Sequence, residues 1–133
     1  MAIQSSQAMV EDALREVQTL EPQQAIALWQ QPQVLFVDIR ETAELAREGL
    51  IPGALHAPRG VLEFWVDPAS DWHRPELAVP GQSLLLYCAI GWRSALAAQV
   101  LQRMGVPRVS HLGGGFSAWR AAGGAVERLA DKP

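Results

Sequence analysis

The sequence predicts an α/β fold in which helices cover both faces of a parallel sheet. Residues 34–37 and 83–87 are short apolar runs with the length and composition of strands that are buried on both faces. Helical patterns stand between and after these runs, and strands that alternate with helices favour parallel pairing. In such sheets, binding and catalytic sites form at the carboxyl ends of the strands, so the residues that follow the two runs are candidates for function.

The first half of the chain predicts three helices and one central strand. Residues 6–17 have the periodicity of an amphipathic helix, which we expect to cap the domain. Its apolar side comprises Met9, Val10, Ala13, Leu14 and Val17. A second helix is expected to begin near Pro22, a residue typical of a first helical turn. After the strand, a helix over 41–48 should end at Gly49, and residues 51–54 predict a turn that leads into a short extended segment.

The second half predicts a loop, a helix, a third strand and a last short helix. Residues 58–82 have the composition of a loop, apart from an apolar cluster at 61–65 that favours a short helix. After the second apolar run, residues 93–104 predict a helix that ends at the glycine that follows. Its expected inner face comprises Leu96, Val100, Leu101 and Met104. Residues 109–112 predict a strand, and three glycines separate it from a short helix over 116–122.

Composition and charge exclude several classes of protein. The length of 133 residues suits one compact domain, and a hydrophobic fraction of 49% supports a folded core. We divide the chain into an N-terminal helical extension, residues 1–19, and a single domain, residues 20–133. The net charge of −3 gives no basic surface for nucleic acid.

The cysteine and histidine content excludes a disulfide framework and predicts no metal site. Cys88 is the single cysteine, and His56, His73 and His111 lie far apart in the sequence. No apolar run approaches the roughly 20 residues that a membrane helix needs, and charged residues interrupt the N-terminus before a secretory signal could form. We therefore expect a cytoplasmic protein with no membrane contact, in which the lone thiol stays reduced.

The loop that follows the strand at 83–87 carries the candidate chemistry. Cys88 ends this strand, and residues 89–94 lead from it into the next helix. Backbone N–H groups in such a loop lack helical partners and converge on one point, where the helix dipole and Arg93 add positive charge. Gly91 lets the loop curl. A sulfur at that point is held as a nucleophilic thiolate without a histidine base, so we favour a reactive Cys88 over a buried, inert one.

Five motifs follow one another along the chain. They are Val37-Asp38-Ile39-Arg40, the pair Glu41 and Glu44, Ile51-Pro52-Gly53-Ala54, the loop from Cys88 to Arg93-Ser94, and Leu112-Gly113-Gly114-Gly115-Phe116 with Trp119. In this order they resemble the rhodanese family, across about residues 20–127. Leu50 departs from the family, which commonly has histidine before the Ile-Pro-Gly-Ala turn. The resemblance implies a rhodanese-like doubly wound parallel sheet flanked by helices on both faces, with the active loop at its carboxyl edge.

The resemblance also implies an enzyme of the thiosulfate sulfurtransferase type. Cys88 would take the outer sulfur of thiosulfate or of another persulfide donor, and then pass it to cyanide or to a thiol acceptor, which includes the thiol of a small redox protein. The resemblance implies no cofactor. The backbone amides that would hold the sulfur belong to Ala89, Ile90, Gly91, Trp92, Arg93 and Ser94.

Other residues near the loop have two interpretations. Asp38 and Arg40 stand at a strand end, where a structural pair that braces the loops is favoured over direct contact with substrate. Arg59 either binds the sulfonate end of a donor or is a solvated loop arginine. Trp65, Trp72 and Trp92 are candidates for an aromatic rim, whereas Trp29 and Trp119 are expected in the core, and the histidines are given no role.

Three other functions stay open at this level. A persulfide carrier would receive sulfur from a partner protein, and an exposed apolar stretch at 61–65 would favour such docking. A binding module with a silent cysteine is disfavoured by the intact loop from Cys88 to Arg93. Phosphatase or arsenate reductase chemistry is disfavoured because four residues separate Cys88 from Arg93, where phosphatases of similar fold have five, and because a resolving cysteine is missing. The sequence leaves open the donor, the acceptor, the oligomeric state, the role of residues 58–82 and whether Cys88 rests as a persulfide.

Overall fold

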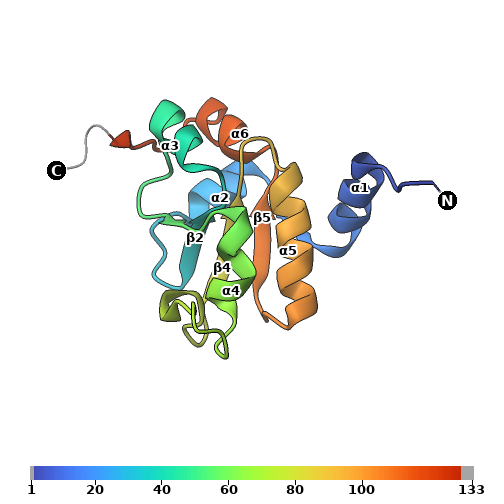
Figure 1. Ribbon diagram of the computed structural model, residues 1–133. Coiled ribbons are helices and arrows are strands. Elements are labelled where there is room, and N and C mark those ends of the chain that lie inside the picture. Colours follow the sequence, from blue (N-terminus) through green and yellow to red (C-terminus); the bar gives the residue numbers. More distant parts are fainter. Residues whose placement is uncertain (1, 130–133) are drawn as a thin grey trace.

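The computed structural model, which describes residues 2–129, contains one five-stranded sheet in which all neighbouring strands are parallel (Figure 1). The strands are β1 (Gln18–Leu20), β2 (Val34–Asp38), β3 (Leu55–His56), β4 (Ser83–Tyr87) and β5 (Val109–Leu112). Their order across the sheet is β1-β5-β4-β2-β3, which places β4 at the centre. Cys88 therefore follows the central strand, at the edge where the carboxyl ends of the strands meet.

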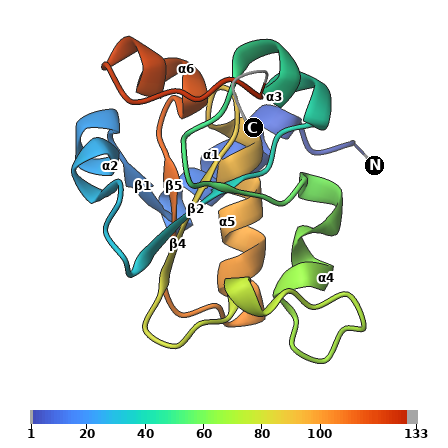
Figure 2. The ribbon, with the colours of Figure 1, turned by 90° about the vertical axis from the view of Figure 1, so that its left-hand side faces the viewer.

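Helices cover both faces of this sheet. They are α1 (Ser6–Glu16), α2 (Pro22–Leu28), α3 (Thr42–Glu48), α4 (Leu62–Val66), α5 (Trp92–Met104) and α6 (Gly115–Ala121), with short 3₁₀ helices η1 (Arg59–Val61) and η2 (Pro75–Leu77). Figure 2 shows α2 and α6 on one side of the strands and α4 and α5 on the other. Helix α1 packs against α5, and α2 packs against α6. The expected α/β class with helices on both faces is confirmed.

Two apolar clusters fill the layers on either side of the sheet, because alternate residues of each strand point to opposite faces. Leu84, Leu86 and Cys88 belong to the cluster under α5. Leu85 and Tyr87 belong to the cluster that also contains the buried aromatic side chains of α6. The chain thus has an apolar core on each side of β4.

The long periodic elements lie where the sequence predicted them. Helix α2 begins at Pro22, and α3 ends before Gly49, whose φ of 84° is a left-handed value that glycine adopts readily. Strands β2, β4 and β5 occupy the predicted apolar runs. The cluster at 61–65 forms η1 and α4, and the turn after Gly49 leads into β3, as expected.

Strand β1 was not predicted. It pairs with β5 through Thr19 and its two neighbours, and three residues are too short to show the alternation that identifies a strand. The predicted division of the chain between residues 19 and 20 falls inside this strand. Along α1, Val10 and Ala13 are buried, whereas Met9 and Leu14 of the predicted apolar side are exposed.

The predicted inner face of α5 was partly wrong. Leu101 is buried, but Leu96 and Val100 are only half-buried and Met104 is exposed. The residues that pack inward are instead small, and comprise Ser94, Ala95, Ala97 and Ala98. Small side chains let a helix approach its neighbours closely, so α5 packs against the sheet and against α1 with Leu101 as its only fully buried large apolar side chain.

Trp119 provides a direct test of the core beneath α6. Its side chain is fully buried, its ring packs edge-on against Phe36 at 5.6 Å between centroids, and its indole N–H donates to the carbonyl oxygen of Ala125 at 2.7 Å. We expect Trp119→Ala to lower the free energy of unfolding by about 3–5 kcal/mol, because it leaves a large cavity. The same change at Trp72, which is 71% exposed, should alter it by less than about 0.5 kcal/mol. Urea denaturation measures both, and equal effects would contradict the assignment of Trp119 to the core.

Candidate active site at the end of the central strand

Backbone and hydroxyl groups of its own loop surround the sulfur of Cys88. The side chain is buried, and its Sγ accepts hydrogen bonds from the N–H of Gly91 at 3.2 Å and from the N–H of Ser94 at 3.3 Å. The thiol donates to Oγ of Ser94 at 3.5 Å. Two amides that point at one sulfur stabilise negative charge on it. Of the six amides that were predicted to converge on the sulfur, residues 89–94, those of Gly91 and Ser94 donate to it.

The remaining amides of the loop are free to bind a further anionic atom. Gly91 has a φ of 100°, which turns the chain into the first turn of the 13-residue helix α5. The amides of Ala89, Ile90, Trp92 and Arg93 have no hydrogen-bond acceptor within residues 2–129. Unpaired amides at a helix N-terminus attract an anion, both by donating to it and through the helix dipole.

The turn before α6 holds the outside of the loop. The N–H of Phe116 donates to the carbonyl oxygen of Cys88 at 2.8 Å, and the N–H of Ser117 donates to that of Ala89 at 3.1 Å. Gly115 has a φ of 63°, and a Cβ atom at this position would lie 2.5 Å from the backbone of Ala89. Because the loop carbonyls are bound by α6, the loop curls around the sulfur with its carbonyls outward.

The guanidinium of Arg93 is bound by a carboxylate of another helix. Both of its terminal nitrogens donate to Glu44 of α3, at 3.0 and 2.9 Å. The hydrogen bond from Arg93 is the main cause that lowers the pKa of Glu44, and the same bond raises the pKa of Arg93. Arg93 therefore keeps its positive charge near Cys88 while the donors of its planar fork are engaged by a carboxylate.

Asp38 and Arg40 form a buried ion pair beside the loop. The pair is bidentate, with distances of 3.0 and 2.7 Å, and both side chains are inaccessible to solvent. Arg40 also donates to the carbonyl oxygen of Gly49, and its guanidinium lies 4.3 Å from the ring centroid of Phe116. The pair thus links the end of β2 to α3 and α6, and its hydrogen bonds do not involve Cys88.

Arg59 lies near the end of β2, with its guanidinium engaged. Its backbone N–H donates to the carbonyl oxygen of Ile39 at 3.0 Å, and its side chain pairs with Glu63 at 2.6 Å. The arginine would have to leave Glu63 before it could bind a donor through the same nitrogen.

The three tryptophans proposed for a rim lie in two places. Trp92 and its loop neighbour Ile90 are 62% and 49% exposed. Trp65 and Trp72 instead line an apolar hollow of about 370 Å³ together with the exposed Phe64, and no residue of the Cys88 loop lines it. Two separate apolar surfaces therefore exist, one on the loop that follows Cys88 and one on α4.

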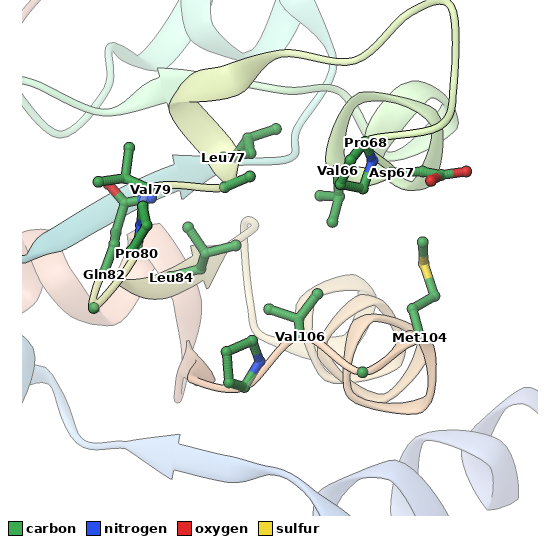
Figure 3. Close-up of a pocket in the computed structure, with 14 residues that line it drawn as sticks. Val66, Asp67, Pro68, Leu77, Val79, Pro80, Gln82, Leu84, Met104 and Val106 are labelled. Carbon is green, nitrogen blue, oxygen red and sulfur yellow. The ribbon is translucent and has the colours of Figure 1, made fainter.

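Another cavity lies at the opposite end of the sheet. It has a volume of about 310 Å³, and Leu77, Leu84 and Val106 project into it from three segments (Figure 3). Leu84 stands near the start of β4, whereas Cys88 follows the end of this strand. The cavity is therefore not part of the candidate active site.

His111 is a site residue that the sequence analysis missed. Its side chain is buried, its Nδ1 lies 2.9 Å from Oγ of Ser94, and its Nε2 lies 2.8 Å from Oγ1 of Thr19. Burial lowers the pKa of His111 to about 4, so the ring is neutral at physiological pH. One signal in the sequence could have found His111, namely its place as the third residue of the predicted strand 109–112. That strand pairs with β4, which leads into Cys88, and His111 lies opposite Leu86 of β4.

Within residues 2–129, no group of three or more histidine, cysteine or carboxylate side chains is arranged to hold a metal ion. In the same part of the chain, every helix is too short or too polar to cross a membrane.

Comparison with protein families gives one match that spans most of the chain. Residues 21–122 match the model of the rhodanese-like domain. A protein of Allochromatium vinosum named as a sulfurtransferase is 36% identical over 90 residues, which are 68% of this chain and 75% of that protein.

Solved structures show the same fold with two kinds of description. A protein of Rhodopseudomonas palustris, of unknown function and described as a possible tyrosine phosphatase, is 43% identical with a TM-score of 0.91 over 96% of this chain and 97% of that one. The thiosulfate sulfurtransferase of Pseudomonas aeruginosa is 25% identical with a TM-score of 0.68, over 84% of this chain and 19% of that one.

The ion pair between Glu44 and Arg93 predicts a pH-dependent contribution to stability. Because the pKa of Glu44 is lower in the folded chain, the pair stabilises the fold above the unfolded-state pKa of about 4.3 and loses this effect as the pH falls through the folded-state pKa. We expect Glu44→Gln to cost about 1 kcal/mol at neutral pH, since Arg93 is partly exposed, and the difference from wild type to shrink toward zero in acid. Urea denaturation from neutral pH downward measures it. If the difference in the free energy of unfolding between wild type and Glu44→Gln grew as the pH fell, the prediction would be contradicted.

The contact between Gly115 and Ala89 predicts an effect on the reactivity of Cys88. Gly115→Ala should move the loop and slow alkylation of Cys88 by iodoacetamide, because the new Cβ has no room beside the backbone of Ala89. Gly53→Ala is the matched control, since Gly53 also has a left-handed φ, of 85°, but has open space around it. Both variants should lose stability, and only Gly115→Ala should alter the alkylation rate. Equal alkylation rates in the two variants would show that this contact does not shape the loop.

Proposed function

The chain belongs to the rhodanese-like domain family, and from this premise we propose that it is a sulfurtransferase that carries sulfane sulfur as a persulfide on Cys88. The observation that carries the proposal is the pair of amides of Gly91 and Ser94 that donate to Sγ, in a loop where four further amides are free within residues 2–129. Such a loop stabilises both a thiolate and the outer sulfur of a persulfide.

In the first step the Cys88 thiolate attacks the outer sulfur of thiosulfate. A new S–S bond forms on Cys88, the S–S bond of the donor breaks, and its electron pair leaves with sulfite. The negative charge of the thiolate passes to the outer sulfur of the persulfide. The amides of Ala89, Ile90, Trp92 and Arg93 are the groups we assign to this charge, with the guanidinium of Arg93 nearby. Another persulfide donor reacts in the same way.

In the second step a thiolate or cyanide attacks the outer sulfur. The bond to Sγ breaks, Cys88 returns as a thiolate, and the acceptor leaves as a persulfide or as thiocyanate. The exposed Ile90 and Trp92 give the mouth of the loop an apolar rim, which suits a thiol carried on a small molecule or on a small redox protein. The cycle needs no cofactor, and it needs a reducing compartment such as the cytoplasm, where Cys88 stays free.

The surrounding charged residues have supporting roles in this proposal. Asp38 and Arg40 brace the loop through β2 and α6 rather than contact the sulfur. Arg59 is less suited to bind the donor than the loop amides, because its guanidinium is paired with Glu63.

Phosphatase activity is the second candidate, since a structural neighbour at 43% identity is described as a possible tyrosine phosphatase. A phosphate ester needs several donors around three oxygens, and arginine usually supplies two of them. Here both terminal nitrogens of Arg93 are taken by Glu44, and Sγ itself occupies two of the loop amides. These contacts favour sulfur transfer over phosphate ester hydrolysis.

The first test is thiocyanate formation from thiosulfate and cyanide. We expect turnover by the wild-type chain and its loss in Cys88→Ala, because no other cysteine can carry sulfur. Intact mass after incubation with a persulfide donor should show one added sulfur in the wild type and none in the variant. Hydrolysis of p-nitrophenyl phosphate is measured in parallel and should be absent.

The outcomes separate the candidates. A folded wild type that gains sulfur but makes no thiocyanate would be a carrier rather than a thiosulfate enzyme. A wild type that gains no sulfur and hydrolyses the phosphate ester in a Cys88-dependent manner would be a phosphatase, and the proposal would be wrong.

A further inference from the structure

A chain of hydrogen bonds runs from Cys88 away from the mouth of the loop. Sγ of Cys88 lies 3.5 Å from Oγ of Ser94, which lies 2.9 Å from Nδ1 of His111. The other ring nitrogen, Nε2, lies 2.8 Å from Oγ1 of Thr19. The four residues come from the end of β4, the first turn of α5, β5 and β1, so the tertiary structure alone brings them together.

The imidazole is neutral, so one ring nitrogen donates and the other accepts. Burial is the cause, since it lowers the pKa of His111 to about 4. Both neighbours of the ring, Ser94 and Thr19, are hydroxyl groups, which either donate or accept. The hydrogen bonds from Cys88 to Thr19 therefore have two self-consistent directions, which differ in the tautomer of His111 and in the orientation of the hydroxyl groups.

Each direction fits one charge state of the sulfur. When Cys88 is a thiol, its S–H donates to Ser94, the Ser94 hydroxyl donates to Nδ1, and Nε2–H donates to Thr19. When Cys88 is a thiolate, Nδ1–H donates to Ser94, which frees the Ser94 hydroxyl to donate to the sulfur. The carbonyl oxygen of Gly91, 3.3 Å from the same hydroxyl, competes for this proton, but the charged sulfur is the stronger acceptor.

We propose that His111 is a positioning residue for Cys88, and that its tautomer, transmitted through the hydroxyl of Ser94, reverses when the sulfur becomes negatively charged. In the thiolate direction the sulfur gains a third hydrogen-bond donor beside the amides of Gly91 and Ser94. The Ser94 hydroxyl thus stabilises the thiolate. When the thiol re-forms, this hydroxyl donates to His111 again instead of to the sulfur.

The proton balance of the reversal is simple. The thiol proton passes to Ser94, the Ser94 proton to Nδ1 of His111, the Nε2 proton to Thr19, and the hydroxyl proton of Thr19 to water. Cys88 is the only group whose charge changes. Thr19 is only half-buried at the edge strand β1, so the proton leaves on the side away from the substrate.

Charged groups also lie around Cys88. Arg93 of α5 interacts electrostatically with Cys88, and Glu44 of α3 offsets part of this charge through its ion pair. Asp38 at the end of the neighbouring strand β2 forms a buried ion pair with Arg40, which follows this strand. These groups are the same in all the variants proposed below. Differences between variants therefore report the hydrogen bonds from Cys88 through Ser94 and His111 to Thr19, which we call the hydroxyl–imidazole chain.

The tautomer of His111 can be observed directly by ¹⁵N NMR of the wild-type protein. We expect protonated Nε2 where Cys88 is a thiol and protonated Nδ1 at the higher pH where it has ionised, with no change in ring charge. In Cys88→Ala the tautomer should no longer change across this pH range. A tautomer that stays constant in the wild type while Cys88 ionises would overturn the proposal.

Variants test the same chain through the pH profile of alkylation, which reports Cys88 alone because it is the single cysteine. Ser94→Ala and His111→Gln should each raise the pH of half-maximal alkylation by about one unit, a roughly tenfold loss of thiolate below both midpoints. The double variant should shift no further. His111→Asn, whose amide keeps a donor near the place of Nδ1, should shift less than His111→Gln. His73→Gln, at a histidine bonded to the carbonyl oxygen of Trp65, is the matched control.

The outcomes are distinct from those of the sulfurtransferase test. The inference rests on the proposed function only in taking Cys88 as the reacting group, and neither measurement uses a sulfur donor. A protein that makes no thiocyanate can therefore still change the tautomer of His111 when Cys88 ionises. His111 would have a purely structural role if the shifts in the pH of half-maximal alkylation caused by Ser94→Ala and His111→Gln added up in the double variant. The same conclusion would follow if His111→Gln and His73→Gln shifted this pH equally.

Discussion

The backbone of Gly115 lies against the backbone of Ala89 with no room for a side-chain carbon between them, and this contact constrains the shape of the loop that follows Cys88. The amides that follow Gly115 bind the carbonyl oxygens of Cys88 and Ala89. Once these carbonyls face α6, the loop can curl with its amides toward the sulfur. The site at the end of β4 therefore depends on a second strand–helix junction, which follows β5.

The sulfur is held mainly by dipoles. Two amides and one hydroxyl lie within hydrogen-bond distance of Sγ, whereas the nearby arginine is bound by Glu44. Amide dipoles fixed by the fold stabilise a thiolate and a persulfide alike, because they need no rearrangement when the charge moves outward by one atom. A free cation would attract oxyanions more strongly, and the engagement of Arg93 by a carboxylate supports the sulfur transfer that we propose.

The hydroxyl–imidazole chain adds an adjustable donor to this fixed set. Amides can only donate, so they favour the anion in every state. The Ser94 hydroxyl can donate or accept, and a neutral His111 behind it supplies whichever partner is missing. In the cycle that we propose, the sulfur alternates between thiol, thiolate and persulfide, and a neighbour that can either donate or accept follows each change of charge.

Local patterns were sufficient for the central strands, most helix ends and the position of Cys88 directly after a strand, because an apolar run, a capping glycine and a strand end are properties of a few adjacent residues. The same patterns missed β1, which is too short for a period, and misjudged α5, where alanines rather than Met104 face inward because the helix lies close to its neighbours. The loop from Cys88 to Ser94 was a prediction of the sequence alone. That Arg93 binds Glu44, and that Ser94 meets His111 and Thr19, was decided only by the tertiary structure, since these contacts depend on which strands lie side by side in the sheet.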